Sequence, residues 1–133
     1  MVRRLILDTT ALIAFERHDL DPSQFVDDDL AIAAVSIAEY RIGIELADTA
    51  ERAAHRLAAL SAIVATVDVL GYTPSTAEEH ARLLAQVRRV GRPRGAHDLI
   101  IAAHAAETGR LLVSTDAAAR FGGLPGVMVL QPE

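Results

Sequence analysis

The fold follows from a stretch near the N-terminus that reads Leu5-Ile6-Leu7-Asp8-Thr9-Thr10-Ala11-Leu12-Ile13. Its first part is an apolar run that ends abruptly on a carboxylate, and apolar residues resume after the two threonines at helical spacing. This pattern predicts a buried strand, a tight turn and a helix. Asp8 is then expected at the carboxyl end of a strand, where open α/β sheets bind their ligands.

The composition predicts one compact domain with an aliphatic core. The chain has 133 residues, of which 51% are hydrophobic and only 4% aromatic. A chain of this length usually forms one domain, so we expect a single domain over residues 1–133. The sequence contains no cysteine, which excludes disulfides, thiolate catalysis and cysteine-ligated metal centres and is typical of a reducing cytoplasm.

Neither a signal peptide nor a membrane span is expected. Asp8 and Glu16 interrupt the apolar residues that follow the N-terminal arginines, which does not fit a secretory signal. No run approaches the roughly 18 apolar residues of a membrane span. We therefore expect a cytoplasmic protein without a membrane partner.

The rest of the chain alternates predicted strands with predicted helices. Strands are expected at residues 2–7, 30–35, 63–70, 111–113 and 127–130, and helices at 9–17, 36–48, 49–60, from 74 onward and at 96–108. Ser36 and Glu39 fit the Ser-x-x-Glu capping box of a helix start. Strands that alternate with helices indicate an α/β fold, with three α/β/α layers and a mostly parallel central sheet.

Four acidic residues stand at strand ends or helix starts within apolar sequence: Asp8, Glu39, Asp98 and Asp116. Each has a local explanation as a helix cap, a partner of a helix dipole or an Asx-turn. Together, however, converging carboxylates repel one another unless a cation lies between them. Oxygen ligands of this kind suit Mg²⁺ or Mn²⁺. Metal-assisted hydrolysis of phosphodiesters is the reaction that such a site supports best.

Five segments carry a resemblance to a known family: Leu7-Asp8-Thr9-Thr10-Ala11-Leu12, Ser36-Ile37-Ala38-Glu39-Tyr40, His97-Asp98-Leu99-Ile100-Ile101-Ala102-Ala103, Leu112-Val113-Ser114-Thr115-Asp116 and Phe121-Gly122-Gly123-Leu124-Pro125-Gly126-Val127. In this order and at this spacing, the chain resembles the PIN-domain family, and more closely the VapC-like toxins of bacterial type II toxin–antitoxin pairs. The resemblance covers essentially the whole length. It implies a PIN-like fold and a Mg²⁺-dependent endoribonuclease that forms a homodimer and is held inactive by a cognate antitoxin.

The resemblance also implies roles for individual residues. Asp8, Glu39, Asp98 and Asp116 match the acids of the metal site, and the supporting hydroxyls are Thr9, Thr10, Ser114 and Thr115. Two features depart from the family pattern. The run between Asp116 and Phe121 reads Ala-Ala-Ala-Arg, so any fifth acid is absent, and His97 stands where asparagine is often seen.

A positively charged segment precedes the predicted helix at 96–108. It contains Arg88, Arg89, Arg92 and Arg94, and the run Gly91-Arg92-Pro93-Arg94-Gly95 favours an open loop. The formal net charge of the whole chain is −5, but arginine binds phosphate well and phosphate contacts carry much of the affinity for nucleic acid. We expect these arginines, together with His97, to bind RNA; a solvated helix end is the alternative.

Two other functions are compatible with these residues. A non-catalytic nucleic-acid or protein-interaction module would use the same acids as helix caps and would bind no metal. A phosphohydrolase would use Asp8 as a covalent nucleophile. The second of these fits poorly, because the residue two positions after Asp8 is Thr10 and not the second aspartate of the haloacid-dehalogenase pattern.

Overall fold

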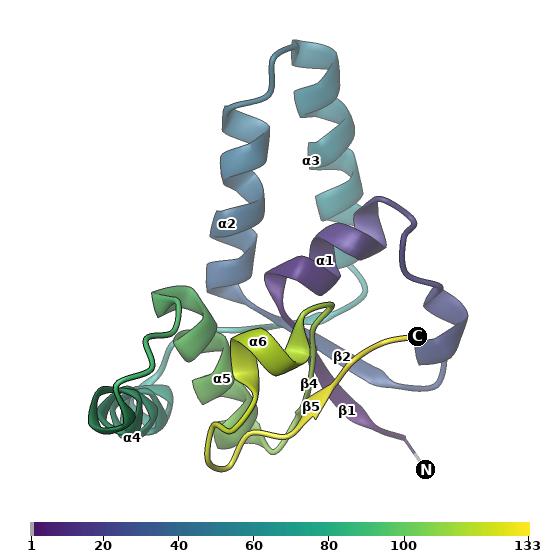
Figure 1. Ribbon diagram of the computed structural model, residues 1–133. Helices are drawn as coiled ribbons and strands as arrows, with labels where there is room; N and C mark the ends of the chain where they lie inside the picture. Colours follow the sequence, from purple (N-terminus) through teal and green to yellow (C-terminus); the bar gives the residue numbers. More distant parts are fainter. Residues whose placement is uncertain (1) are drawn as a thin grey trace.

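The computed structural model describes residues 2–133 (Figure 1). Its strands are β1 (Arg4–Leu7), β2 (Asp29–Ala33), β3 (Asp68–Leu70), β4 (Leu111–Val113) and β5 (Val129–Leu130). Its helices are α1 (Thr9–Glu16), α2 (Ala34–Glu45), α3 (Ala50–Val64), α4 (Pro74–Val90), α5 (Ala96–Thr108) and α6 (Ala117–Phe121). A short 3₁₀ helix, η1, spans Pro22–Phe25.

The five strands form one parallel sheet in the order β3-β2-β1-β4-β5. In the middle of the sheet, Leu5 of β1 pairs with Leu30 of β2 and with Leu111 of β4. The chain leaves β1 for β2 and β3 on one side and then returns to β4 on the other. The order of the strands therefore reverses between β1 and β4, and their carboxyl ends flank the crevice in which such sheets bind ligands. The predicted α/β fold is confirmed, and its sheet is wholly parallel.

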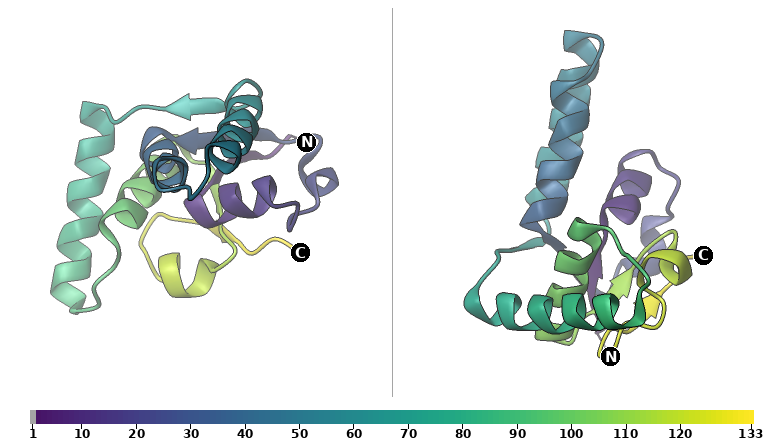
Figure 2. Two further views of the ribbon diagram at one scale, coloured as in Figure 1. Left: turned by 90° about the horizontal axis from the view of Figure 1, so that it is seen from above. Right: turned by 60° about the vertical axis from the view of Figure 1, so that its left-hand side comes forward.

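Alternation along β1 divides the core between the two faces of the sheet. Ile6 packs with Leu83 of α4 and Leu99 of α5, whereas Leu5 and Leu7 belong to the cluster that includes α1. All of these side chains are buried. Figure 2 shows α4 and α5 on one side of the sheet and α1 on the other. The predicted three-layer arrangement is thus confirmed.

Helices α2 and α3 form an antiparallel hairpin that projects from the body of the molecule (Figure 1; Figure 2). At its base, Leu12 of α1 packs against Tyr40 of α2 and Leu60 of α3. Tyr40 is only 7% exposed, and its hydroxyl donates a hydrogen bond to the carbonyl of Arg56 at 3.4 Å. Tyr40 therefore belongs to the core.

Two local predictions are wrong. Helix α2 begins at Ala34, its N-cap Ala33 makes no side-chain hydrogen bond, and Ser36 is fully buried inside the helix, so no Ser36–Glu39 capping box forms. The expected strand at 63–70 is confined to Asp68–Leu70, because α3 continues through Val64 and packs that residue into the core. A helix that was not expected, α6, follows Asp116.

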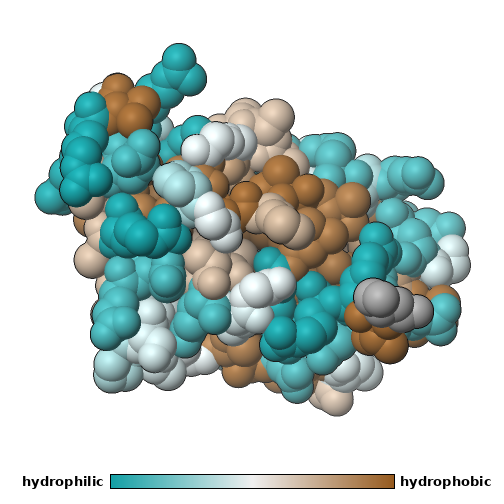
Figure 3. Space-filling view, turned by 90° about the horizontal axis from the view of Figure 1, so that it is seen from below, coloured by the Kyte–Doolittle hydropathy of each residue, from teal (hydrophilic) through white to brown (hydrophobic). Residues whose placement is uncertain are grey.

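The face of the molecule away from the hairpin has a mixed surface. Apolar side chains gather near its middle, and hydrophilic side chains surround them (Figure 3). No helix within residues 2–133 combines the length and the hydrophobicity that crossing a membrane requires.

Candidate active site

Asp8 is buried at the point where β1 ends. It caps α1: its Oδ1 atom accepts hydrogen bonds from the N–H of Ala11 at 2.8 Å and from the hydroxyl of Thr10 at 2.7 Å. Its own N–H donates to the carbonyl of Val113 at 2.9 Å, across the gap between β1 and β4. The residue is 0% exposed, and its Oδ2 atom has no hydrogen-bond partner among residues 2–133. Because a buried polar atom without a partner is costly, Oδ2 points to a ligand-binding role.

Hydroxyl groups join the turn after β1 to the loop after β4. The Thr10 hydroxyl lies 3.3 Å from Oγ of Ser114 and accepts a hydrogen bond from the N–H of Thr115 at 3.1 Å. The buried Oγ of Ser114 accepts a hydrogen bond from the N–H of Asp116 at 3.1 Å. This network holds the Asp116 loop against the Asp8 turn. Thr115 takes part in it through its backbone, whereas Thr10 and Ser114 use their side chains.

Glu39 reaches the same edge of the sheet from α2. The hydroxyl of Thr9 donates to its Oε1 atom at 2.7 Å and lies 3.2 Å from Oγ of Ser36. The Nδ1 atom of His97, from α5, lies 3.5 Å from its Oε2 atom, and the two side chains are 51% and 28% exposed, respectively. The structure therefore places Glu39 and His97 together at the open rim of the site.

Asp98 lies in the first turn of α5 and faces an arginine of its own chain. Nη1 of Arg120 lies 3.2 Å from Oδ2 and 3.4 Å from Oδ1 of Asp98. Burial raises the pKa of the Asp98 carboxyl above its ordinary value; the Arg120 guanidinium opposes this rise, and the charges of Asp8 and Glu39 add to it. The three carboxylates are therefore close enough to feel one another's charge. A side chain at Gly95 would crowd Asp98, because a Cβ atom there would lie 3.1 Å from Oδ2.

Asp116 completes the set on the far side of the crevice. It precedes α6 without capping it through its side chain, which is 58% exposed. Its Oδ2 atom lies 3.8 Å from Nε of Arg120, one helical turn further along the chain. Asp116 is thus the most exposed of the four acids, and it shares Arg120 with Asp98.

The site suits a hard divalent cation in its donor chemistry. Carboxylate and hydroxyl oxygens are the ligands that Mg²⁺ and Mn²⁺ prefer, and the unpartnered Oδ2 of Asp8 is the atom that such an ion would satisfy. No three acidic or histidine side chains within residues 2–133 are grouped closely enough to hold an ion as they stand. The side chains at the rim, Glu39 and Asp116, therefore have to turn inward for an ion to be held.

The arginines predicted to bind RNA differ in their surroundings. Arg88, Arg89 and Arg92 are exposed at the end of α4 and in the loop that follows it. Arg94 instead donates hydrogen bonds to the carbonyls of Ala119 at 3.0 Å and Gly122 at 2.6 Å. The first three remain free to meet a solvent-borne phosphate, whereas Arg94 is engaged in holding α6.

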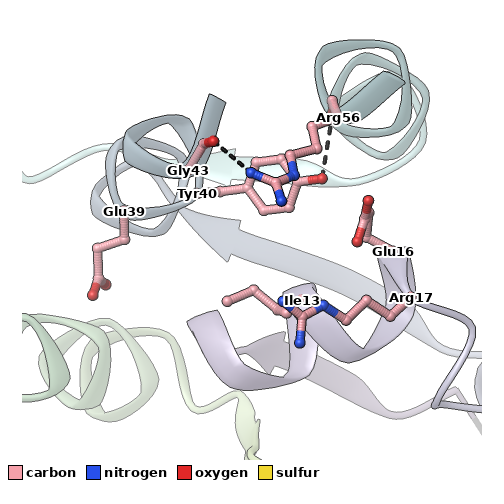
Figure 4. Close-up of a pocket in the computed structure, with 7 residues that line it drawn as sticks. All are labelled: Ile13, Glu16, Arg17, Glu39, Tyr40, Gly43 and Arg56. Carbon is pink, nitrogen blue, oxygen red and sulfur yellow. Dashed lines mark hydrogen bonds between the residues drawn. The ribbon is translucent and has the colours of Figure 1, made fainter. Parts of the chain in front are cut away.

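A pocket of about 300 Å³ opens between α1 and the α2–α3 hairpin, with Glu39 at one end (Figure 4). It is lined by Ile13, Glu16, Arg17, Glu39, Tyr40, Gly43 and Arg56. Arg56 crosses it and donates to the carbonyl of Gly43 at 2.6 Å. Burial, reinforced by the charge of Glu16, raises the pKa of Tyr40 to about 12, so its hydroxyl stays protonated. The pocket adjoins the acidic edge at Glu39, and its charged lining comprises two acids and two arginines.

The fold and the acidic edge of its sheet define the class of the protein. Residues 5–121 match the sequence profile of the PIN domain family. That match covers both ends of the site, from the strand before Asp8 to the helix after Asp116. The chain is a PIN-domain protein, as its motifs predicted.

Comparison with individual proteins narrows the class. The chain is 33% identical over 97 residues to the tRNA(fMet)-specific endonuclease VapC of Shigella flexneri, and this alignment covers 71% of each protein. It is 33% identical over 111 residues to Ribonuclease VapC5 of Mycobacterium tuberculosis, covering 84% of this chain and 82% of that protein. The crystal structure of VapBC-5, a toxin–antitoxin system of the same organism, superposes with a TM-score of 0.80 at 31% identity and covers 96% of this chain and 98% of the other. The chain belongs to the VapC family of PIN-domain proteins.

The four acids predicted for the site lie at one edge of the sheet, and an arginine that the sequence did not predict lies beside two of them. The Ala-Ala-Ala-Arg run was interpreted as the loss of a fifth acid, whereas the structure shows that the run forms α6 and brings Arg120 into the site. A signal was present, because alanines favour a helix and Asp116 and Arg120 are spaced i,i+4 as an ion pair.

Proposed function

We propose that the protein is the endoribonuclease toxin of a type II toxin–antitoxin pair, which hydrolyses RNA phosphodiester bonds with a Mg²⁺ or Mn²⁺ ion. Asp8, Glu39, Asp98 and Asp116 would hold the ion. The observation that carries this proposal is the buried, unpartnered Oδ2 of Asp8, which lies at the switch point of the sheet with the other acids around it. The names of the relatives, as a ribonuclease and an endonuclease, support the same activity.

A bound ion would lower the pKa of water to provide the nucleophile and would offset charge on the phosphate. The side chains of the protein perform the other tasks. Oδ1 of Asp8 is held by Ala11 and Thr10, which leaves Oδ2 in a fixed position. The Thr9 hydroxyl orients Glu39 by donating a hydrogen bond to the Oε1 atom of the glutamate. These contacts fix the Asp8 carboxylate before substrate arrives and hold Glu39 at the rim, from which it has only to turn inward.

The exposed arginines give the acidic site a way to attract its substrate. Arg88 and Arg89 lie in the last turn of α4, and Arg92 lies in the loop that leads to α5, the helix that carries His97 and Asp98. We propose that they bind the RNA backbone on either side of the scissile phosphate, with His97 at the rim. Phosphate contacts of this kind make binding fall steeply as the salt concentration rises.

An antitoxin is the protein partner that the comparisons favour. The solved relatives include complexes of VapC toxins with their antitoxins, among them VapBC-5 of Mycobacterium tuberculosis. The acidic edge of the sheet, where Oδ2 of Asp8 has no partner among residues 2–133, is suited to a peptide with an arginine, because opposite charges attract there. A pull-down with the product of the neighbouring open reading frame tests this partner.

We further propose that two copies of the chain form a homodimer that acts in the cytoplasm, where RNA and antitoxin are present. The apolar area on the face away from the hairpin is a surface that a second copy could cover (Figure 3). Light scattering coupled to size-exclusion chromatography tests the dimer: a mass of one chain, 14.2 kDa, contradicts it.

The activity is tested by incubating purified protein with structured RNAs, with Mg²⁺ or with a chelator. We expect internal cleavage that requires the ion and that is lost in Asp8→Asn and Asp98→Asn. Asp48→Asn is the matched control, because Asp48 is an exposed acid at the hairpin, paired with Arg52. Cleavage that persists in the chelator, or variants at Asp8 and Asp98 as active as the control, would overturn the proposal.

A further inference from the structure

An arginine is built into the acidic edge of the sheet. Nη1 of Arg120 lies 3.2 Å from Oδ2 of Asp98, and its Nε lies 3.8 Å from Oδ2 of Asp116. The Nε atom is buried and makes no hydrogen bond within residues 2–133. The guanidinium group therefore lies between two of the four acids, on the side of the site that is formed by α5 and α6.

The chain fixes this arginine in position from several directions. Helix α6 spans only Ala117–Phe121, and Gly122 ends it so tightly that a Cβ atom there would lie 2.5 Å from the carbonyl oxygen of Ala118. Arg94 holds the same helix by donating to the carbonyls of Ala119 and Gly122. These contacts hold the backbone that carries Arg120, and its guanidinium group is held in turn by Asp98 and Asp116.

The charge of Arg120 has a specific consequence for cation binding. Acids that converge on one edge attract cations, and in two-metal sites a second ion neutralises the carboxylates and the phosphate together. A guanidinium between Asp98 and Asp116 already supplies positive charge there. A divalent ion close to it would be repelled, whereas Oδ2 of Asp8, which has no partner, remains available to an ion.

We propose that Arg120 is the second cation of the site: it neutralises part of the charge of Asp98 and Asp116, so the four acids hold one divalent ion, nearest to Asp8, and not two. This inference rests on the proposed metal-dependent function. Arg120 contacts Asp98 through Nη1 and Asp116 through Nε, and Nη2 takes no part in these contacts. In the complex with RNA, Arg120 takes the place of a second ion by donating to an oxygen of the scissile phosphate.

Calorimetric titration with Mn²⁺ at low salt, without RNA, tests the proposal. Wild type is expected to bind one ion per chain and Arg120→Glu two. Arg120→Ala is expected to bind its first ion about tenfold more tightly, because one unit of positive charge is removed from the edge that holds the ion. Arg120→Lys keeps the charge and is expected to stay within about threefold of wild type.

The control is Arg52→Ala, which removes the same charge from an exposed pair at the hairpin. Circular dichroism checks that each variant is folded. If Arg120→Ala does not fold, the comparison of Arg120→Lys with Arg120→Glu still tests the effect of the charge. RNA cleavage gives the second readout: Arg120→Ala is expected to be slower in spite of its tighter ion, a divergence that a merely structural role does not produce.

Two outcomes overturn the inference and leave the proposed function intact: wild type binds two ions, or Arg120→Ala binds Mn²⁺ no more tightly than Arg52→Ala. If neither wild type nor any Arg120 variant binds Mn²⁺, the inference and the metal-dependent function fail together. If only the variants bind it, wild type holds no ion on the side of Asp8, and the inference and the metal-dependent function are again contradicted together.

Discussion

Replacing Asp8 with asparagine separates the two roles that this side chain has in the structure. Asparagine has nearly the same shape, and its Oδ1 can accept the same hydrogen bonds from Ala11 and Thr10. It lacks the negative charge that a divalent cation requires. We therefore expect Asp8→Asn to keep the fold and to lose most of its affinity for Mn²⁺, whereas Asp8→Ala loses the cap of α1 as well.

The contacts of Asp8 set the size of each effect. Loss of the helix cap in Asp8→Ala is expected to lower the free energy of unfolding by about 1 to 2 kcal/mol. Asp8→Asn is expected to stay within about 1 kcal/mol of wild type without the ion. Mn²⁺ at about 100 times its dissociation constant adds about 2.7 kcal/mol to wild type. For a chain of 133 residues, that gain corresponds to roughly 10 °C in melting temperature.

Thermal unfolding followed by circular dichroism, with and without Mn²⁺, measures both effects in one series. Asp48→Asn again serves as the control for removing a carboxylate, since Asp48 is 67% exposed. The reasoning is refuted if Asp8→Asn gains as much melting temperature from Mn²⁺ as this control does. It is also refuted if Asp8→Asn and Asp8→Ala are equally destabilised in the absence of the ion, because the cap would then contribute nothing.

Three further predictions concern other parts of the structure. Burial lowers the pKa of His104 below its ordinary value of 6.5. Below about pH 6.5, the unfolded chain therefore binds more protons than the folded one. The free energy of unfolding then decreases as the pH is lowered, by at most about 1.4 kcal/mol per pH unit. Urea unfolding between about pH 7.5 and about pH 5 is expected to show a shallower fall in His104→Leu, and equal slopes contradict this. Arg110 is only 5% exposed, so Arg110→Ala is expected to cost about 2 to 3 kcal/mol in urea unfolding. Arg3→Ala, which breaks an ion pair in which the arginine side chain is 46% exposed, is expected to cost clearly less than Arg110→Ala; similar costs for the two argue against a burial effect. Gly95→Ala places a Cβ atom 3.1 Å from Oδ2 of Asp98 and is expected to weaken Mn²⁺ binding with little change in stability, so calorimetry that shows wild-type affinity rejects this crowding.

The fold could be predicted from the sequence because its signals are local. Leu5, Ile6 and Leu7 form a continuous apolar run, as a strand covered on both faces requires, and the structure buries all three. Asp8 follows that strand directly, so its place at the carboxyl edge of the sheet came from the pattern alone. Element types were predictable where one short segment carried the whole signal.

The wrong predictions of secondary structure arose where long-range contacts decide between two conformations that the local sequence allows. Ser36 and Glu39 match a capping box, but α2 begins two residues earlier, directly after β2, so the serine is turned into the core and bonds Thr9. Val64 is a β-branched residue that favours a strand. It lies one helical turn after Leu60, however, and packing of α3 against α1 and α2 keeps it helical. A sequence pattern does not contain these long-range contacts.

The sequence predicts where the four acids lie in the fold, but it does not predict the positive charge beside them. Asp98 was recognised from its position at the start of an apolar helix. Its partner Arg120 comes from a helix twenty-two positions later, and the pairing depends on how Arg94 and Gly122 hold that helix. The sign of the charge beside Asp98 therefore became visible only in three dimensions.

The central claim is that an ion held by the Asp8 edge acts on the scissile phosphate. Once the cleavage site on an RNA has been mapped, sulfur can replace one non-bridging oxygen of that phosphate, and cleavage rates can be compared in Mg²⁺ and in Mn²⁺, which accepts sulfur more readily. We predict that the substitution slows wild-type cleavage in Mg²⁺ and that Mn²⁺ restores the rate for one of the two stereoisomers. An equal slowing in both ions, for both stereoisomers, would contradict direct contact between the ion and the phosphate.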